Sequence, residues 1–182
     1  MKQNKIILFA SVILLLFCSI NVDAQRKHST TSKRVSKSAS FCPDSKHPHW
    51  IDMGLPSGTK WCCCNEGAST PESYGEYYKT GQVSSAPTLA QINELVEECS
   101  YEWTKLNGVI GGKFKGTNGG TIFLPAAGLL WDWGGFEVGK AGYYWSSTDY
   151  DQWKTYTLEF GLFGGGRSLQ PNKSRRTVRP VQ

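Results

Sequence analysis

The chain has 182 residues, which allows one or at most two domains, and its aromatic content of 13% excludes a disordered chain. It carries 20 Lys and Arg against 15 Asp and Glu, and this net charge of +5 suggests a nucleic-acid or anionic-surface partner. Seven of the basic residues but only one acidic residue lie in residues 1–40, so residues 41–182 have a net charge of −1. The domain itself is not basic, and we expect no nucleic-acid partner.

The N-terminal residues have the three parts of a secretory signal peptide. Two lysines precede an uncharged stretch over 6–20, and Ala24 ends a Val-Asp-Ala sequence of the kind that signal peptidase cleaves. The stretch spans about 22 Å as a helix, which is too short for a bilayer core of about 30 Å. We predict a signal peptide over 1–24 and an exported protein, in the periplasm, at the cell surface or outside the cell. A lipidated Cys18 is the alternative, which the bulky Phe17 before it disfavours.

Residues 25–40 contain Lys, Arg, Ser and Thr but no acidic or aromatic residue. Such a segment cannot bury apolar surface, so we predict a basic disordered linker. We expect at most a weak contact between its charges and an anionic envelope surface, because runs of this kind are usually solvated. The folded domain is then expected over residues 41–182.

Short runs rich in β-branched and aromatic residues, bounded by Gly, Pro, Asn or Ser, predict many strands in this domain. In chain order the predicted strands are Trp50–Met53, Lys60–Cys64, Lys113–Lys115, Thr121–Leu124, Tyr143–Ser146, Thr155–Phe160 and Arg176–Arg179.

Two helix starts and one hairpin turn complete the expected elements. Pro71 after Thr70 favours a short helix. Thr88 and Gln91 form a capping box ahead of apolar residues at three- and four-residue spacing, which predicts a helix over about Leu89–Cys99. Asn118-Gly119 is typical of a type I′ turn between two strands. The elements together predict an α+β fold.

The last predicted strand places Arg176 and Arg179 in an alternating pattern. Alternation puts every second side chain on one face of a strand. We interpret this pattern as a solvated edge, with a binding patch as the alternative.

Four ordered segments carry a family resemblance: Trp50-Ile-Asp-Met-Gly-Leu-Pro-Ser-Gly-Thr-Lys-Trp61, Ile122-Phe-Leu-Pro-Ala-Ala-Gly128, Gly142-Tyr-Tyr-Trp-Ser-Ser-Thr148 and Val178-Arg-Pro-Val181. Their order over residues 49–181 resembles the Fibrobacter succinogenes major paralogous domain, a secreted module of gut Bacteroidetes related to C-type-lectin-like folds. The resemblance implies a C-type-lectin-like mixed domain with short strands, one or two helices and much irregular loop. It also implies ligand binding by loops in the C-terminal half, and no enzyme activity.

Five cysteines remain after removal of the signal peptide, so at least one is a free thiol or bonds to another chain. The resemblance implies a disulfide bond between Cys64 and Cys99. As a second bond we expect Cys42 to pair with Cys62 or Cys63, because joining cysteines that are neighbours in sequence would strain the bond. A metal site built from these cysteines with two nearby histidines is the alternative, but its spacing matches no standard zinc motif, and exported proteins favour disulfides. We expect no metal and no cofactor.

The sequence gives little support to catalysis. Residues 134–141 are close to a phosphate-binding loop but end in Ala141, which has no hydroxyl for magnesium. There is no Gly-x-Ser-x-Gly motif for a hydrolase. Asp149 and Asp151 are the remaining carboxylate pair, and they leave a glycoside hydrolase as a remote alternative.

Aromatic residues next to acidic ones, in glycine-bounded loops, are the strongest functional signal. Such rings stack on sugars or anchor protein partners, although they more often fill a core. The sequence therefore predicts an exported, non-catalytic binding module for an unknown glycan or protein, and the alternative is a structural cell-envelope domain. The predicted ligand-binding residues are Trp131, Asp132, Trp133, Asp149, Tyr150, Asp151 and Trp153.

Overall fold

A computed structural model describes residues 48–182 of the chain. The predicted signal peptide over 1–24, the linker over 25–40, Cys18 and Cys42 lie outside the described residues.

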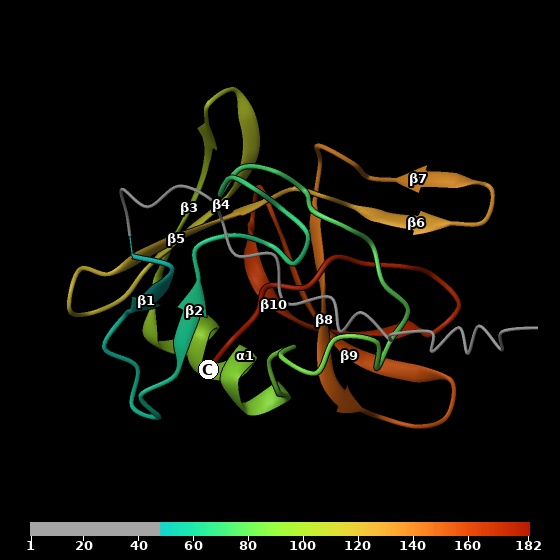
Figure 1. The fold of residues 1–182 in the computed structure, drawn as a ribbon, viewed down its shortest axis with the longest axis horizontal. Coiled ribbons are helices and arrows are strands. Elements are labelled where there is room, and N and C mark those ends of the chain that lie inside the picture. Colours follow the sequence, from blue (N-terminus) through green and yellow to red (C-terminus); the bar gives the residue numbers. More distant parts are fainter. Residues whose placement is uncertain (1–47) are drawn as a thin grey trace, which may run out of the picture. The chain divides into compact units, whose positions relative to one another are not determined.

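Antiparallel strand pairs dominate the described part of the chain, and one helix accompanies them (Figure 1). The elements are β1 (Trp50–Asp52), β2 (Lys60–Cys62), α1 (Leu89–Glu98), β3 (Ser100–Leu106), β4 (Val109–Lys115), β5 (Thr121–Pro125), β6 (Leu129–Trp131), β7 (Gly134–Phe136), β8 (Gly142–Asp149), β9 (Lys154–Gly161) and β10 (Gly164–Pro171).

The predicted α+β, C-type-lectin-like fold is wrong, because the described residues are predominantly β with a single helix. Four strands that the sequence pattern did not predict, β3, β6, β7 and β10, account for the difference. Two of them, β7 and β10, begin with consecutive glycines, which suggest turns and loops rather than strands. Pairing with a neighbour over eight positions makes β10 a strand all the same.

The strands form two three-stranded sheets, β3-β4-β5 and β10-β9-β8, and two hairpins, β1-β2 and β6-β7. A cluster of rings joins the two larger sheets in the core. The ring of Phe160 on β9 lies 5.9 Å from that of Phe114 on β4 and 5.6 Å from that of Tyr144 on β8. The buried side chains of Ile92 and Leu95 cover this cluster from α1.

Helix α1 begins where the sequence predicts. Gln91 N donates to the Thr88 hydroxyl at 3.3 Å, and Thr88 N donates to the Gln91 side-chain oxygen at 2.8 Å. These two bonds complete the predicted capping box, which satisfies backbone donors at the helix start. The helix ends at Glu98, one residue before the predicted end.

The predicted helix after Thr70 is wrong, because the chain makes a single turn there, in which Ser73 N donates to the Thr70 carbonyl at 3.2 Å. The carbonyls that a helix would use internally accept bonds from distant residues instead. Tyr74 O accepts from Asn65 and from Thr177, each at 2.9 Å. Tertiary contacts therefore determine the conformation of this segment.

The two Asn-Gly pairs of the sequence have different roles. Asn107-Gly108 is the type I′ turn, with φ of +49° and +86°, and it joins β3 to β4. The predicted turn at Asn118-Gly119 lies in a longer loop between β4 and β5, in which Gly119 but not Asn118 has positive φ. The Asn118 side chain donates to the carbonyl of Asp52 at 3.1 Å, so this loop is anchored to the end of β1.

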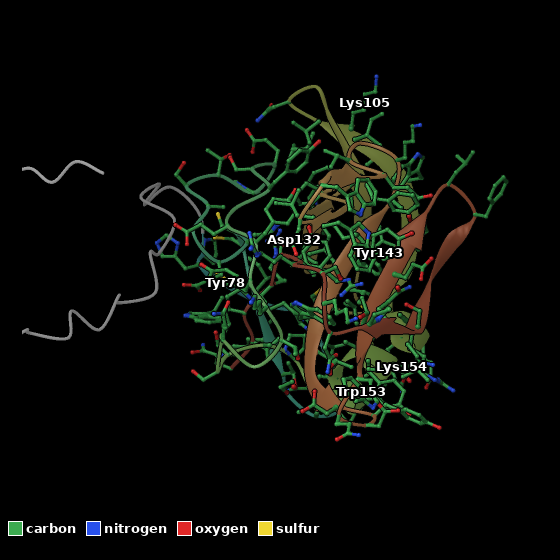
Figure 2. All side chains as sticks on the ribbon, turned by 90° about the vertical axis from the view of Figure 1, so that its right-hand side faces the viewer. Tyr78, Lys105, Asp132, Tyr143, Trp153 and Lys154 are labelled. Carbon is green, nitrogen blue, oxygen red and sulfur yellow. The ribbon has the colours of Figure 1, made fainter. Side chains whose placement is uncertain are left out.

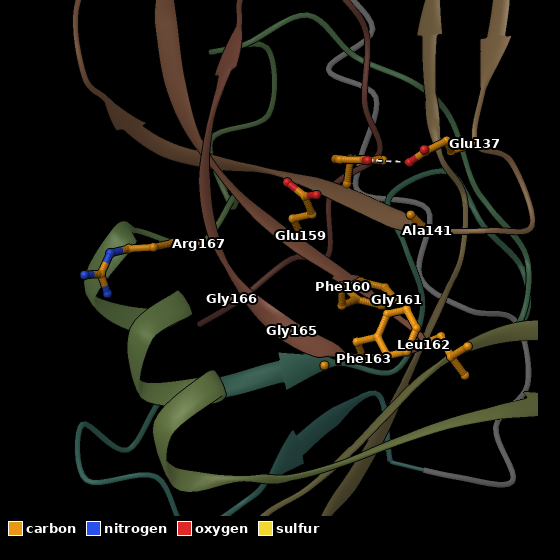
Figure 3. Close-up of a pocket in the computed structure, with 12 residues that line it drawn as sticks. Glu137, Ala141, Glu159, Phe160, Gly161, Leu162, Phe163, Gly165, Gly166 and Arg167 are labelled. Atoms are coloured by element: carbon orange, nitrogen blue, oxygen red, sulfur yellow. Dashed lines mark hydrogen bonds between the residues drawn. The ribbon is translucent and has the colours of Figure 1, made fainter.

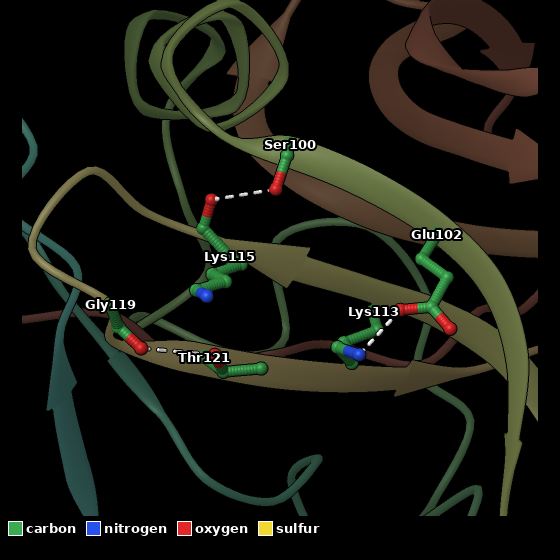
Figure 4. A network of polar contacts seen from close by, with 6 residues as sticks. All are labelled: Ser100, Glu102, Lys113, Lys115, Gly119 and Thr121. Atoms are coloured by element: carbon green, nitrogen blue, oxygen red, sulfur yellow. Dashed lines mark hydrogen bonds and ion pairs between the residues drawn. The ribbon is translucent and has the colours of Figure 1, made fainter.

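Polar contacts cross the outer face of the β3-β4-β5 sheet (Figure 4). Lys113 on β4 forms an ion pair with Glu102 on β3, and Ser100 Oγ donates to the Lys115 carbonyl at 3.3 Å. Lys113 also lowers the pKa of Glu102 by hydrogen bonding to it. Pairs of this kind across exposed strands contribute little each, but they favour one strand register.

The predicted strand Arg176–Arg179 is not a strand, and its arginines are not solvated. Arg176 and Arg179 are both fully buried. The segment makes isolated bridges instead, from Arg176 to Tyr78 and from Thr177 to Tyr144. Arg179 donates to the carbonyls of Cys62 and Phe123, at 3.0 and 2.7 Å. Buried arginine requires such acceptors, and here they are mainly backbone carbonyls.

Candidate functional site

The first predicted loop is the turn of the β6-β7 hairpin. Trp131 pairs with Gly134, so Asp132 and Trp133 form a two-residue turn. The rings of Trp131 and Trp133 are stacked, with centroids 6.4 Å apart and planes 9° apart. Asp132 forms an ion pair with Arg175 at 3.7 Å. Trp133 is 73% exposed, and the stacked ring of Trp131 restricts the rotation of its side chain.

The second predicted loop joins β8 to β9. The Asp151 carboxylate accepts from the backbone N–H groups of Trp153 and Lys154, at 2.7 and 2.8 Å. Asp149 accepts from the Thr155 hydroxyl at 2.6 Å. Each aspartate thus uses an oxygen to shape the turn, as loop aspartates commonly do. Trp153 is 65% exposed.

Tyr150 belongs to the same loop and is 58% exposed. Its ring meets that of Tyr156 edge to face, with centroids 5.9 Å apart. The loop therefore presents two aromatic side chains to solvent, on a turn that the aspartates hold.

The structure places the predicted residues in two separate clusters. Trp131 to Trp133 form one cluster, and Asp149 to Trp153 the other; Figure 2 shows Asp132 well above Trp153. The segment between them is 172–175. Asn172 N donates to the Trp153 carbonyl at 2.9 Å, and Arg175 exchanges two backbone hydrogen bonds with Leu130. The two clusters are linked through this segment but do not share a ring contact.

The predicted Cys64–Cys99 bond is absent from the structure, in which Cys99 has a free thiol and packs against the main core. Cys64 lies in a separate small cluster with its neighbouring cysteines and Ala68. In residues 48–182 no group of three or more His, Cys, Asp or Glu side chains is placed to hold a metal ion. No helix in that range is long and apolar enough to cross a membrane.

Sequence reasoning missed a groove of about 480 Å³ on the β10-β9-β8 sheet (Figure 3). Its lining includes two glutamates, a tyrosine, a glycine of β10 and the two apolar residues of the β9-β10 turn. These residues are Glu137, Tyr143, Glu159, Gly166, Leu162 and Phe163. Phe163 is fully exposed.

The polar residues of this groove have defined partners. The Tyr143 hydroxyl donates to the Glu137 carboxylate, and Gln170 Nε2 donates to Glu159 at 3.3 Å. Burial, followed by the hydrogen bond to Glu137, raises the pKa of Tyr143 above its usual range. The tyrosine is therefore protonated at neutral pH and serves as a donor.

One buried guanidinium lies next to the groove, close enough to Tyr143 and Glu159 to interact with both. Arg176 stacks over the Trp145 ring, with its Cζ atom 4.0 Å from the ring centroid. Burial lowers the pKa of Arg176 to about 10, so the group stays charged at neutral pH. Its Nε atom is buried and has no hydrogen-bond partner among the described residues.

The run Gly164-Gly165-Gly166 is a signal for the groove that is visible in the sequence, but consecutive glycines suggest a loop rather than the floor of a groove. Glu137 carries a second signal that only the structure reveals. Its φ of +54° is unusual for a non-glycine residue, and its carbonyl accepts from both Lys140 and Ala141. The tight turn directs its carboxylate toward Tyr143.

Comparison of the chain with protein-family models, with curated proteins and with solved structures found no match.

Proposed function

We propose that the chain is an exported, non-catalytic binding module that contacts a glycan or protein ligand through the aromatic residues of its β6-β7 turn and β8-β9 loop. Export is supported by the three-part N-terminal sequence. The resemblance to the Fibrobacter succinogenes major paralogous domain agrees with a secreted binding role and remains a prediction.

The observation that carries the proposal is the exposure of Trp133 and Trp153. Trp61 and Trp145 are fully buried in the same domain, so exposure is not a general property of its tryptophans. Indole rings are enriched at binding surfaces, because they bring a large contact area at a low cost in conformational entropy.

The loops hold these rings in advance of binding. Trp133 is stacked on Trp131, and the Trp153 backbone is fixed by the Asp151 carboxylate and by Asn172. A ring that is already positioned loses less conformational freedom when a ligand binds. Asp132 and Arg175 add hydrogen-bonding groups beside the first cluster.

The test is a glycan array and an affinity pull-down with the purified chain. Trp133→Ala and Trp153→Ala should abolish binding of the captured ligand while the far-UV and near-UV circular dichroism stay unchanged. Leu169→Ala is the control, because it removes an exposed apolar side chain outside both clusters and outside the groove of the β10-β9-β8 sheet, and it should bind normally. Absence of any ligand in both screens would favour a structural envelope domain.

A further inference from the structure

The groove on the β10-β9-β8 sheet has a floor made of one cross-strand row. Tyr143 on β8 pairs with Glu159 on β9, which pairs with Gly166 on β10. Paired residues of antiparallel strands project from the same face of a sheet. The adjacent row, Tyr144 and Leu158, is buried in the core on the other face. The floor residues therefore face away from the core and into the groove.

The fold does not require the glycine at Gly166. Its φ is not positive, and a Cβ atom added there would meet nothing within 4 Å. Glycine inside a strand costs about 0.5–1 kcal/mol relative to alanine, and it often marks a place where a ligand or another backbone approaches closely. The space beside Gly166 is open and belongs to the groove, so the strand backbone is accessible to a ligand there.

The groove has one negative charge in excess. Glu137 and Glu159 each accept a hydrogen bond from a neutral group, Tyr143 and Gln170. Arg176 supplies one buried positive charge that interacts with Glu159. The side chain of Arg167 points away from both carboxylates toward α1, where it donates to Asn93 at 3.2 Å (Figure 3). Among the described residues, one carboxylate charge is therefore left without a cation.

Beside these carboxylates lies an apolar rim. Leu162 and Phe163 form the turn between β9 and β10, and both are strongly exposed. An aliphatic chain can lie against such a rim while a charged end reaches the carboxylates, as long basic side chains commonly do.

We propose that this groove binds an alkylammonium group, of the kind carried by a lysine side chain, with the ammonium between Glu137 and Glu159 and the aliphatic arm against Leu162 and Phe163. The ammonium donates to carboxylate oxygens that the protein leaves unused. The groove shares no residue with the two aromatic clusters, so it is a second binding site.

The test is a titration of the purified chain, followed by NMR, with Nα-acetyl-lysine-N-methylamide at low salt. A ligand of this size should bind with a dissociation constant of about 1 mM or tighter and shift the backbone amides of residues 164–167. The norleucine analogue, which keeps the four side-chain carbons but lacks the ammonium group, should produce no shift. A titration with 1-aminopentane distinguishes the two sources of the alkylammonium group. If 1-aminopentane binds as tightly as the lysine compound, the natural ligand is a free amine. If it binds more weakly, the natural ligand is a lysine within a peptide.

Three variants locate the site. Glu159→Gln and Glu137→Gln should each weaken binding by about fivefold or more, and Gly166→Val should abolish it by filling the groove. Glu97→Gln removes the same charge from the exposed face of α1 and should leave affinity unchanged. Equal binding of the norleucine analogue, equal losses in Glu97→Gln and Glu159→Gln, or no binding of either amine would overturn the proposal. Trp133→Ala should bind the lysine compound normally, which keeps this result independent of the proposed function.

Discussion

The Nε atom of Arg179 donates a hydrogen bond to Oδ1 of Asn65 at 2.8 Å, in the interior of the domain. The Asn65 amide in turn donates to the Tyr144 hydroxyl at 3.0 Å, and that hydroxyl donates to the Pro125 carbonyl at 2.8 Å. This buried chain of polar groups connects residues that are far apart in the sequence. Because its members have partners, it orients the segments around it.

Arg179→Met should lower the free energy of unfolding by about 3–5 kcal/mol, because it leaves the buried Asn65 oxygen and two backbone carbonyls without donors. Arg175→Met removes a largely exposed ion pair and should cost less than about 1 kcal/mol. Urea denaturation of both variants measures the difference. Equal costs would show that the buried network contributes nothing specific.

Gly108→Ala should lower the free energy of unfolding by about 1–2 kcal/mol, because a Cβ atom is unfavourable at φ +86° in a type I′ turn. Gly166→Ala is the matched control within a strand. Its φ is not positive and its surroundings are open, so it should raise stability by about 0.4–1 kcal/mol or leave it unchanged. Thermal denaturation of the pair checks the sign of each change, and destabilisation by Gly166→Ala would contradict the open floor of the groove.

Trp145→Ala and Trp133→Ala should separate core rings from surface rings. Trp145 is fully buried, donates to the Tyr78 carbonyl at 2.8 Å and lies under Arg176, so its loss should cost about 3–5 kcal/mol. Trp133 makes one stacked contact and should cost about 0.5 kcal/mol or less. Chemical denaturation distinguishes these outcomes, and a large loss in Trp133→Ala would place that ring in the stabilising core.

The Cys99 thiol should react slowly with alkylating reagents. Burial, followed by the charges of Glu98 and Glu94, raises the pKa of Cys99 to about 11. At pH 8 its thiolate population is then about 100-fold below that of the unfolded chain. Since the folded pKa is the higher one, stability from this group is present below the unfolded pKa and falls as pH rises toward 11.

Labelling at Cys99, followed by peptide mass spectrometry in native buffer and in urea, measures this protection. Glu98→Gln should speed the native reaction, because it removes a nearby negative charge. Equal rates in native buffer and in urea would show that the thiol is not protected by the fold.

Local signals explain the elements that the sequence predicted correctly. The capping box at Thr88 and Gln91 involves residues three apart, so it is visible in the sequence itself. The strands at 50–52, 60–62 and 154–161 likewise follow from β-branched and aromatic runs. The sequence pattern did not predict β10, because its glycines form a strand only when β9 lies beside them.

Tertiary partners explain most of what the sequence could not predict. The prediction that Arg176 and Arg179 share one face of a strand is wrong, because residues three apart in an extended strand project to opposite faces. The sequence pattern also did not indicate that both side chains are buried. Their acceptors are mostly main-chain carbonyls, such as those of Cys62 and Phe123, which any sequence supplies. For the candidate site, the sequence identified both aromatic loops, whereas the groove depends on Tyr143, Glu159 and Gly166 lying on three neighbouring strands.

The bridges made by residues 175–181 bear on how the protein matures. This segment contacts Leu130, Tyr78, Tyr144 and Trp61, which belong to regions spread over the whole domain. It also follows every strand of residues 48–182, so the ribosome completes all ten of these strands before the segment can be placed. The native arrangement therefore closes only after synthesis of these residues, and a nascent chain halted before residue 175 should remain open to proteases and chaperones.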